Sequence, residues 1–308
     1  MRISLDALQI LDAIDTQGSY AAAASRLHRV PSALSHAMQK LEGELGVELF
    51  EKSGRRAILT AAGRTLLEDG RHLLRAALEL ESRVKRVATG WETELFIAVD
   101  SVIPGERLYP LLQRFYDEGH GTRLRLSYEV LGGCWDALTT GRADLVIGAP
   151  GDMPARGGIA TRPLGTMELV FTMAPGHPLS TVPEPIPAHE LARYRAVVLA
   201  DTSRELAART SGLLEGQDAL RVPDMQSKAA AQTAGLGVGH LPPWLVAREV
   251  AAGRLITRTL AEPKGSTPLH IAWRPSHEGR ALAWFLAALE EPAIQSEITQ
   301  GLRPDLCL

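Results

Sequence analysis

The residues best suited to chemistry form a polar face on one short predicted helix. Residues 28–50 are HRVPSALSHAMQKLEGELGVELF, and four polar side chains recur there at helical spacing: Ser32, Ser35, His36 and Gln39. Their hydroxyl, imidazole and amide groups are donors and acceptors that suit base edges in the major groove of DNA. Taken alone, the segment also fits an ordinary amphipathic helix with a solvated outer face.

The other face of the same segment is apolar, with residues at i, i+4, i+7 and i+11: Leu34, Met38, Leu41 and Leu45. Pro31 suits the first turn of a helix, and Gly46 suits its end. Upstream, Ser4 and Ser19 are expected N-caps of two further helices separated by Gly18. The short connection LHRV before the polar face then predicts a helix-turn-helix.

A basic hairpin is expected directly after this unit. In ELFEKSGRRAILT, two short apolar runs flank Ser53-Gly54, which places Lys52, Arg55 and Arg56 at the tip. Beside a recognition helix, such a wing can reach phosphates or the minor groove.

From Thr60 onward, residues 60–90 predict one long helix with a heptad pattern. One column of the pattern is Leu66, Leu73, Leu80 and Val87, and the other is Gly63, Gly70, Ala77 and Val84. A seam of this length predicts helix pairing, and its small residues would let two backbones approach closely. Packing against the core of its own chain is the alternative. A dimer would place two recognition helices on the half-sites of a partly symmetric operator.

Residues 91–308 alternate between strand and helix patterns. ELFIAVD, TRLRLSYEVL and ADLVIGAP are expected strands, and IPGERLYPLLQRFYDEG and GGCWDALTTG are expected helices. This alternation predicts a mostly parallel α/β sheet, whose ligands lie beyond the carboxyl ends of the strands. The residues expected there are Asp100, Ser101, Val102, Leu131, Gly132, Gly133, Asp201, Thr202 and Ser203. Backbone amides and hydroxyls could hold a small polar group. Asp100 and Asp201 would either oppose an anion or bind a cation, and the sequence leaves both open.

Other motifs give weak signals. Gly235-Leu-Gly237-Val-Gly239 follows a helix and precedes an apolar strand, the wrong context for a dinucleotide fingerprint. The histidines outside the first ninety residues lack ligand spacing, and neither Cys134 nor Cys307 has the surroundings of a nucleophile or a metal ligand. We therefore expect no cofactor, no metal and no catalytic residue.

Length and charge agree with a chain of more than one domain. The chain has 308 residues, enough for two or three domains. Residues 1–90 hold 13 Lys and Arg against 11 Asp and Glu, a net charge of +2, which leaves 20 against 25, or −5, for residues 91–308. With neither a secretory signal nor a membrane-spanning segment in the sequence, we expect a soluble, cytoplasmic protein without membrane contact.

The order of these blocks resembles the LysR-type transcriptional regulators. GSYAAAASRLH, SALSHAMQKLEGELGVELF and LTAAG match the winged helix-turn-helix of that family, while RVPSALS and GWET resemble its YhaJ-like subgroup. The stretch AAAQTAGLGVGHLPPWLV is similar to a signature of the family's effector domain, which has two lobes of periplasmic-binding-protein type.

The resemblance implies three parts: a DNA-binding domain at 1–59, a dimerisation helix at 60–90 and an effector domain at 91–308. The two lobes would comprise 91–166 with 272–308, and 167–271. Carried over by position, the base-facing residues are Pro31, Ser32, Ser35 and His36, with Arg55 and Arg56 in the wing. The family's helix commonly opens with Ser-Gln-Pro and carries an arginine after the second serine. Here Val30, Pro31, Ser32 and His36 stand in those places, so a bidentate arginine contact to guanine is unavailable and the base preference stays open.

We therefore expect a sequence-specific DNA-binding regulator controlled by a small molecule held between the lobes. Its partners would be double-stranded operator DNA, the effector, further copies of itself as dimer or tetramer, and RNA polymerase. The alternative is a cytoplasmic enzyme that dimerises through the long helix and reacts in the cleft, although no residue in the sequence identifies itself as its acid, base or nucleophile.

Overall fold

The computed structural model describes residues 2–51, 57–154, 158–277 and 279–303. The chain divides into two compact units, Met1–Ala88 and Thr89–Leu308. The wing residues Lys52, Arg55 and Arg56 lie outside the described residues.

The first unit is helical, and its helices begin and end where the sequence predicts. It contains α1 (Leu5–Gln17), α2 (Tyr20–Arg26), α3 (Pro31–Leu45) and the long α4 (Ala61–Thr89). The hydroxyls of Ser4 and Ser19 accept hydrogen bonds from the N–H groups of Ala7 and Ala22, which confirms both as N-caps. Gly18 and Gly46 end α1 and α3 in the left-handed conformation that favours glycine.

The apolar face of α3 lies in the core of this unit. Leu34, Met38 and Leu41 are buried there against α1, and Leu45 is half-buried. The carboxylate of Glu42 accepts hydrogen bonds from the N–H groups of Leu49 and Phe50, so the end of α3 holds the start of the hairpin that follows. Phe50 pairs with Leu59 in an antiparallel bridge.

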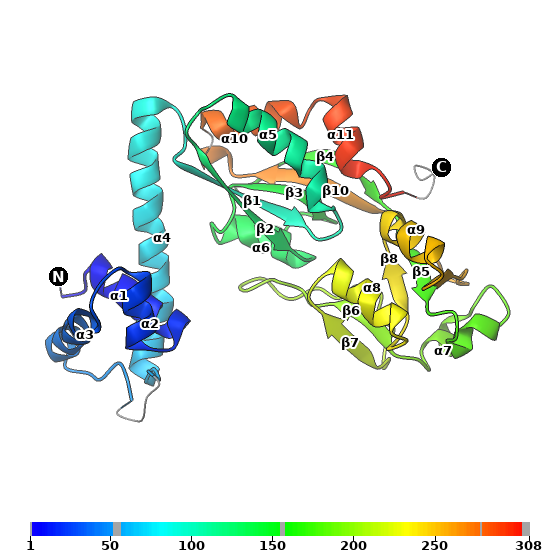
Figure 1. Cartoon of the computed structure of the whole chain (residues 1–308), viewed down its shortest axis with the longest axis horizontal. Helices are drawn as coiled ribbons and strands as arrows, with labels where there is room; N and C mark the ends of the chain where they lie inside the picture. The colour runs from blue at the N-terminus through cyan, green and yellow to red at the C-terminus, as the bar shows by residue number, and fades with distance from the viewer. Residues whose placement is uncertain (1, 52–56, 155–157, 278, 304–308) are drawn as a thin grey trace. The chain divides into compact units, whose positions relative to one another are not determined.

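The N-terminal part of α4 packs against its own unit, beside α1 and α2 (Figure 1). Leu67 is buried in the core, and the backbone at Gly63 and Gly70 lies directly on Leu49 and Leu8. A Cβ at Gly70 would lie 2.7 Å from Leu8 Cδ2. The two small seam residues therefore serve close packing within one chain, the alternative that the sequence left open for this helix.

The first lobe of the second unit contains a five-stranded sheet in the order β2-β1-β3-β10-β4. These strands are β1 (Glu94–Asp100), β2 (Arg123–Glu129), β3 (Leu145–Pro150), β4 (Ala160–Met167) and β10 (Thr267–Trp273). β1 is parallel to β2 and β3, whereas β10 is antiparallel to β3 and β4. All of β10 belongs to this sheet, so the chain returns to the first lobe at Thr267, before the boundary at 271/272 that the sequence suggested.

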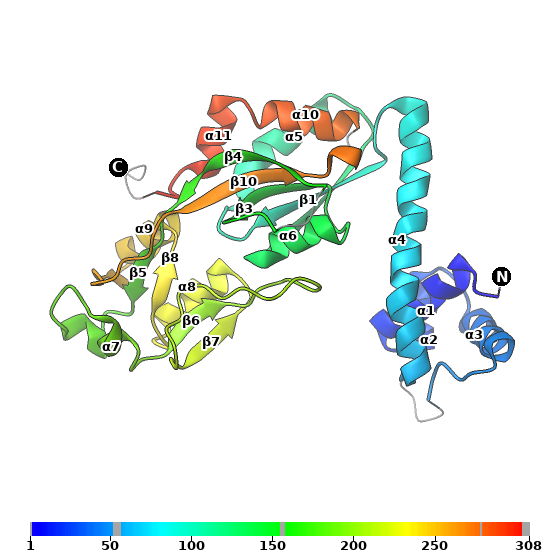
Figure 2. The same ribbon diagram turned by 180° about the vertical axis from the view of Figure 1, so that it is seen from behind.

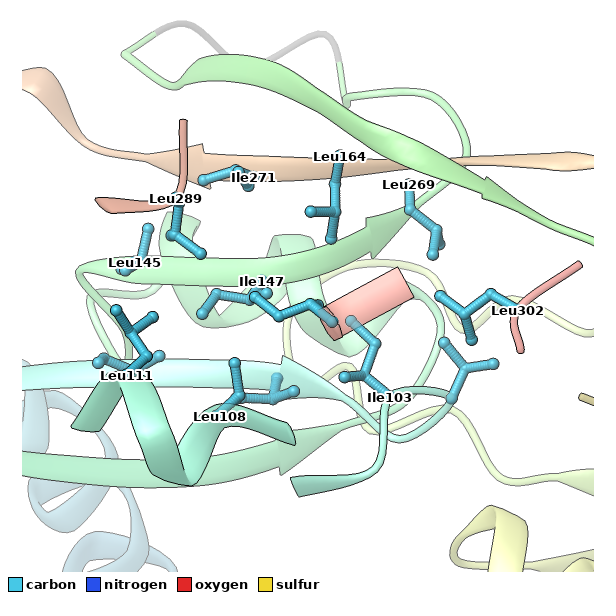
Figure 3. Packing of buried hydrophobic residues seen from close by; sticks show 14 of the residues in the cluster. Ile103, Leu108, Leu111, Leu145, Ile147, Leu164, Leu269, Ile271, Leu289 and Leu302 are labelled. Carbon is cyan, nitrogen blue, oxygen red and sulfur yellow. The ribbon is translucent and has the colours of Figure 1, made fainter. Parts of the chain in front are cut away.

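Helices cover both faces of that sheet. α5 (Tyr109–Asp117), α10 (Arg280–Ala288) and α11 (Pro292–Thr299) lie over one face, and α6 (Gly132–Thr139) lies over the other (Figures 1 and 2). Figure 3 shows the apolar core beneath the first group, where Ile147 and Ile271 of the sheet meet Leu108, Leu111 and Leu289. The short 3-10 helices are Gly105–Leu108, Pro178–Thr181 and Pro275–His277.

The second lobe is smaller. β5 (Val170–Met173) lies between β8 (Gly239–Leu241) and β9 (Ile256–Thr257), and β6 (Ala196–Leu199) pairs in parallel with β7 (Ala219–Val222). A parallel bridge between Ala196 and Val238 links the two sheets. The helices of this lobe are α7 (Ala188–Leu191), α8 (Met225–Thr233) and α9 (Pro243–Ala251). Two crossing segments therefore join two α/β lobes, as the sequence predicted. The expectation of mostly parallel sheets is wrong, because β10 runs antiparallel to β3 and β4 in the first lobe, and β5 runs antiparallel to β8 and β9 in the second.

Candidate functional site

The polar face of α3 is accessible. Pro31, Ser32, His36 and Gln39 are exposed, and Ser35 is half-buried. None of these side chains forms a hydrogen bond with another residue in the described part of the chain. The helix start also lacks a side-chain cap, because Val30 stands at the N-cap. Polar side chains and uncapped N–H groups thus share one end of α3, where both could bind nucleic acid.

The C-terminal part of α4 carries an exposed apolar stripe. Leu73, Leu80, Val84 and Val87 are exposed by 55%, 56%, 62% and 83%. Ala77 is half-buried, and Leu66 lies half-buried against the core of its own unit. Because a helix exposes so much apolar surface only at a cost, the stripe needs a covering partner.

The two lobes of the second unit are hydrogen-bonded to each other at the start of α6. The carboxylate of Asp201 accepts the N–H of Gly132 at 3.0 Å and the N–H of Ser203 at 2.7 Å. Thr202 donates its hydroxyl to Glu129 and accepts the N–H of Val130 at 2.9 Å. A Cβ at Gly133 would overlap the Thr202 hydroxyl, so only glycine permits this approach.

A buried ion pair reinforces that contact. Arg142 binds both Glu129 and Asp136, and Asp136 is completely buried. The free oxygen of Asp136 accepts the N–H groups of Glu205 and Leu206 at 2.9 and 2.8 Å. These N–H groups and Arg142 hold the pKa of Asp136 below its usual value, although burial alone would raise it. We call this contact between residues 129–142 and 201–206 the interlobe latch.

Beside the latch lies a cavity of about 60 Å³ between the two lobes. Its lining comes from both lobes and comprises Asp100, Val102, Leu131, Pro150, Met167, Leu169, Leu199, Ser211, Met225, Lys228, Lys264 and Thr267. Most of these side chains are apolar, and the charged groups among them are one carboxyl and two ammonium groups.

The two lysines are the most unusual groups in the cavity. Lys228 on α8 is only 5% exposed, and burial followed by repulsion from Lys264 lowers its pKa to about 7. Lys264 is half-buried, donates to the hydroxyl of Ser211, and has its pKa lowered by burial. The neighbouring His240 is neutral, since burial and the two lysines lower its pKa to about 3.

Asp100 also lines the cavity, yet its oxygens are engaged by its own lobe. Oδ1 accepts the N–H of Val102 at 2.9 Å, and Oδ2 accepts the thiol of Cys134 at 3.4 Å. Burial raises the pKa of Asp100 to about 7, so the carboxyl is partly protonated at neutral pH.

The residues expected at the cleft, Ser101 apart, thus divide into two groups. Asp100, Val102 and Leu131 line the cavity, whereas Gly132, Gly133, Asp201, Thr202 and Ser203 form the latch. The hydroxyl oxygens of Ser101 and Ser203 are buried, and neither has a hydrogen-bond partner among the residues that the structure describes.

Sequence reasoning missed Lys228 and Lys264. One signal was present, because residues 91–308 contain 18 arginines but only these two lysines. An ammonium group tolerates burial by losing its proton, which a guanidinium group cannot do. A rare lysine on the buried side of the alanine-rich helix segment MQSKAAAQT therefore marks a candidate site.

The remaining motifs have structural explanations. A Cβ at Gly237 would lie 2.5 Å from the carbonyl oxygen of Arg195, and one at Gly239 would lie 2.8 Å from that of Val197. The glycine-rich stretch therefore allows close packing against β6. Cys134 is buried, and burial raises its thiol pKa well above the usual value. Within the described residues, no group of three or more His, Cys, Asp or Glu could hold a metal ion, and no helix is long and apolar enough to cross a membrane.

Comparison with known proteins gives matches over most of the chain. Residues 5–64 match the helix-turn-helix model of bacterial regulatory proteins of the lysR family, and residues 88–293 match the LysR substrate binding domain. The HTH-type transcriptional regulator YeeY of Escherichia coli (strain K12) is 41% identical over 285 residues, which are 92% of each chain.

Two further comparisons agree. The HTH-type transcriptional regulator YhaJ of Escherichia coli O157:H7 is 41% identical over 92% of this chain and 95% of its own. Among solved structures, full-length CbnR complexed with its target DNA has a TM-score of 0.58 and 22% identity, covering 93% of this chain and 99% of that one. The latter similarity concerns the fold.

Proposed function

Since the chain belongs to the LysR family of transcriptional regulators, we propose that α3 recognises operator sequence and that the interlobe cavity holds the effector. The protein is a DNA-binding transcriptional regulator with an effector domain, and the enzyme alternative is set aside. The observation that carries the proposal is the polar start of α3, whose side chains have no partner within the described residues.

On DNA, the proposed division of labour follows from chemistry. Ser32, Ser35, His36 and Gln39 would meet base edges, because their donors and acceptors are free and sit on one face. Pro31 is proposed to face the bases with them, and the uncapped N–H groups at the start of α3 would contact the sugar-phosphate backbone of the DNA. Lys52, Arg55 and Arg56 are proposed to contact phosphates or the minor groove, on the grounds of their charge and sequence position.

The exposed stripe of α4 supports pairing with the α4 of a second copy. Burying Leu73, Leu80, Val84 and Val87 on both helices would remove the exposed apolar surface that a lone helix leaves in water. Ala77 would add a close approach, whereas Leu66 contributes less because its own core already covers part of it. The proposed seam therefore runs from Leu73 to Val87.

A tetramer is supported by a second exposed apolar surface on the first lobe. Tyr109 and Tyr116 of α5, with Leu126 and Tyr128 of the edge strand β2, are all exposed. A pair of dimers joined through this surface would have closed symmetry. RNA polymerase is proposed as a partner because a regulator bound near a promoter acts on transcription, and the cytoplasm is proposed as the compartment because that is where bacterial operator DNA lies.

Effector binding in the cavity would act on the latch. A ligand that contacts both lobes can shift the equilibrium between two lobe arrangements only by the difference in its binding free energy for them. This difference is typically about 1–3 kcal/mol. The latch and the cavity share Leu131 and its neighbours, so a ligand large enough to part the lobes would strain the hydrogen bonds of Asp201.

The proposal is tested by footprinting the purified protein on the DNA upstream of its own gene, across salt concentrations and with cell metabolites added. We expect two spaced half-sites whose protection falls steeply with salt and changes when the right metabolite is present. Absence of protection even at low salt would contradict the proposal.

A further inference from the structure

The cavity between the lobes holds positive charge without a matching negative group. Lys228 is almost fully buried, and no described residue forms a hydrogen bond or ion pair with its ammonium group. Among the described residues, the only hydrogen-bond partner of Lys264 is the neutral hydroxyl of Ser211. Burying unpaired charge costs free energy, so a structural reason for keeping both lysines here is missing.

The other charged group in the lining does not offset the two ammonium groups. Both oxygens of Asp100 accept hydrogen bonds from its own lobe, and burial favours its neutral form. The strongest charge acting on Lys228 is the like charge of Lys264, which follows burial as the cause of its low pKa. An anion entering the cavity would therefore meet two donors and little repulsion.

The rest of the lining sets the character of the molecule that would carry the anion. It consists largely of apolar side chains from both lobes, namely Val102, Leu131, Pro150, Met167, Leu169, Leu199 and Met225. An inorganic anion would leave that surface unused, whereas an organic acid would bury its apolar body there.

We propose that the effector is a small carboxylic acid with an apolar body, whose carboxylate lies between Lys228 and Lys264. This rests on the proposed assignment of the cavity as the effector site and adds the chemical class of the ligand. The site is preorganised for the anion by burial, since a charge-assisted hydrogen bond from a desolvated ammonium group is stronger than one in water.

The test uses the full-length protein in calorimetry and thermal unfolding. The probes are monocarboxylates of increasing size, each beside its own amide and amine, with sulfate and phosphate as inorganic anions. Acetate and propionate are closest in size to the cavity of about 60 Å³, whereas hexanoate and benzoate can enter only if the lobes part. We expect carboxylates to bind and to raise the unfolding midpoint, while the matched amides and amines do not. Binding only of amides, of amines or of inorganic anions would overturn the proposal, and so would the absence of carboxylate binding.

Variants test whether the two lysines bind the carboxylate. Lys228→Met and Lys264→Met should each weaken carboxylate binding about 10–100-fold, as expected when a charged hydrogen bond is lost. Lys228→Arg should retain part of the affinity. Lys40→Met makes the same change at an exposed lysine of α3 and should leave carboxylate binding unchanged. Equal binding by wild type and both cavity variants would refute the assignment.

The unfolding midpoint without ligand shows whether a variant loses binding because it no longer folds. Lys228→Met removes an unpaired buried ammonium group, so the ligand-free midpoint should rise by roughly 5 °C. A lower midpoint would mean that Lys228 stabilises the fold and would count against the proposal. Footprinting distinguishes failure of the proposed DNA-binding role from failure of this inference. Lysine-dependent carboxylate binding without DNA protection would reject the DNA-binding role alone. DNA protection without carboxylate binding would reject this inference alone.

Discussion

The backbone N–H of Gly132 donates a hydrogen bond to the carboxylate of Asp201 across 3.0 Å, and these two residues belong to different lobes. The same carboxylate accepts the N–H groups of Ser203 and Arg209 at 2.7 and 2.6 Å. Asp201 therefore organises its own loop and holds the first turn of α6 at the same time. A ligand that separates the lobes must compete with this bond, so the proposed effector would act on the arrangement of the lobes through Asp201.

Gly133→Ala tests the latch. The new Cβ would overlap the hydroxyl of Thr202 and approach Glu129 Oε2 to 2.8 Å, so residues 201–206 must move. Overpacking of this kind costs about 1–3 kcal/mol, which exceeds the small gain in helix propensity. We expect a lower free energy of unfolding and faster proteolysis of residues 201–218. Gly176→Ala, where nothing lies within 4 Å of the added Cβ, is the control, and equal behaviour of the two variants would contradict the latch.

Leu73→Asp tests the α4 stripe. The side chain is more than half exposed in the single chain, so the variant should fold, but a carboxylate buried in a helix seam has no partner. We expect the mass measured by light scattering to fall to half that of the wild type, with a matching loss of operator affinity. Glu68→Lys places a charge change at another exposed position of α4 and should keep the mass. An unchanged mass for Leu73→Asp would exclude Leu73 from the seam.

Local signals made the DNA-binding unit predictable. Ser4, Gly18, Ser19 and Gly46 determine helix ends through groups within a few residues, and the sequence shows those groups directly. The family resemblance rested on the same segment and is confirmed, with YhaJ among the relatives. The small residues of α4 show the limit of such signals, because glycine at residues 63 and 70 indicates a close approach without indicating which surface approaches.

The proposed effector site was less predictable because its parts are distant in sequence. Asp100, Val102 and Leu131 were found from the ends of strands in the first lobe. Lys228 comes from a helix of the second lobe, and Lys264 from the segment that returns to the first lobe. Only the folded arrangement brings the two ammonium groups to one cavity. The pairing of Thr202 with Glu129 likewise depends on contact between lobes, which strand and helix patterns do not encode.

Ser32→Ala and His36→Ala test the division between residues that recognise bases and residues that position the protein. Both side chains are exposed and have no partner in the described part of the chain, so their loss should leave folding intact. Where a base contact is lost, discrimination between operators should fall by about 1–3 kcal/mol, with the salt dependence unchanged. Binding to a library of operator variants measures this. Glu44→Ala, at the other end of α3, is the control, and an equal loss on every DNA sequence would show that the residues do not recognise bases.

The low pKa of Lys228 predicts a pH-dependent benefit of removing its charge. In the folded chain the pKa is about 7 instead of 10.5, so the unfolded chain holds a proton that the folded chain lacks between those pH values. The penalty of burying the ammonium group is therefore full below pH 7 and disappears as the pH rises toward 10.5. Three titratable groups face Lys228: Lys264, which carries a charge of the same sign, the neutral His240, and the buried Asp100.

Urea unfolding of the wild type and of Lys228→Met at pH 6 and pH 9 measures this penalty. We expect the advantage of Lys228→Met to shrink from pH 6 to pH 9 by on the order of 3 kcal/mol. Lys40→Met is the matched control, because Lys40 is largely exposed and its removal should change stability equally at both pH values. If the stability difference between Lys228→Met and wild type stays constant with pH, Lys228 keeps its proton throughout this range. Binding of a carboxylate beside Lys228 would then take up no proton from solution.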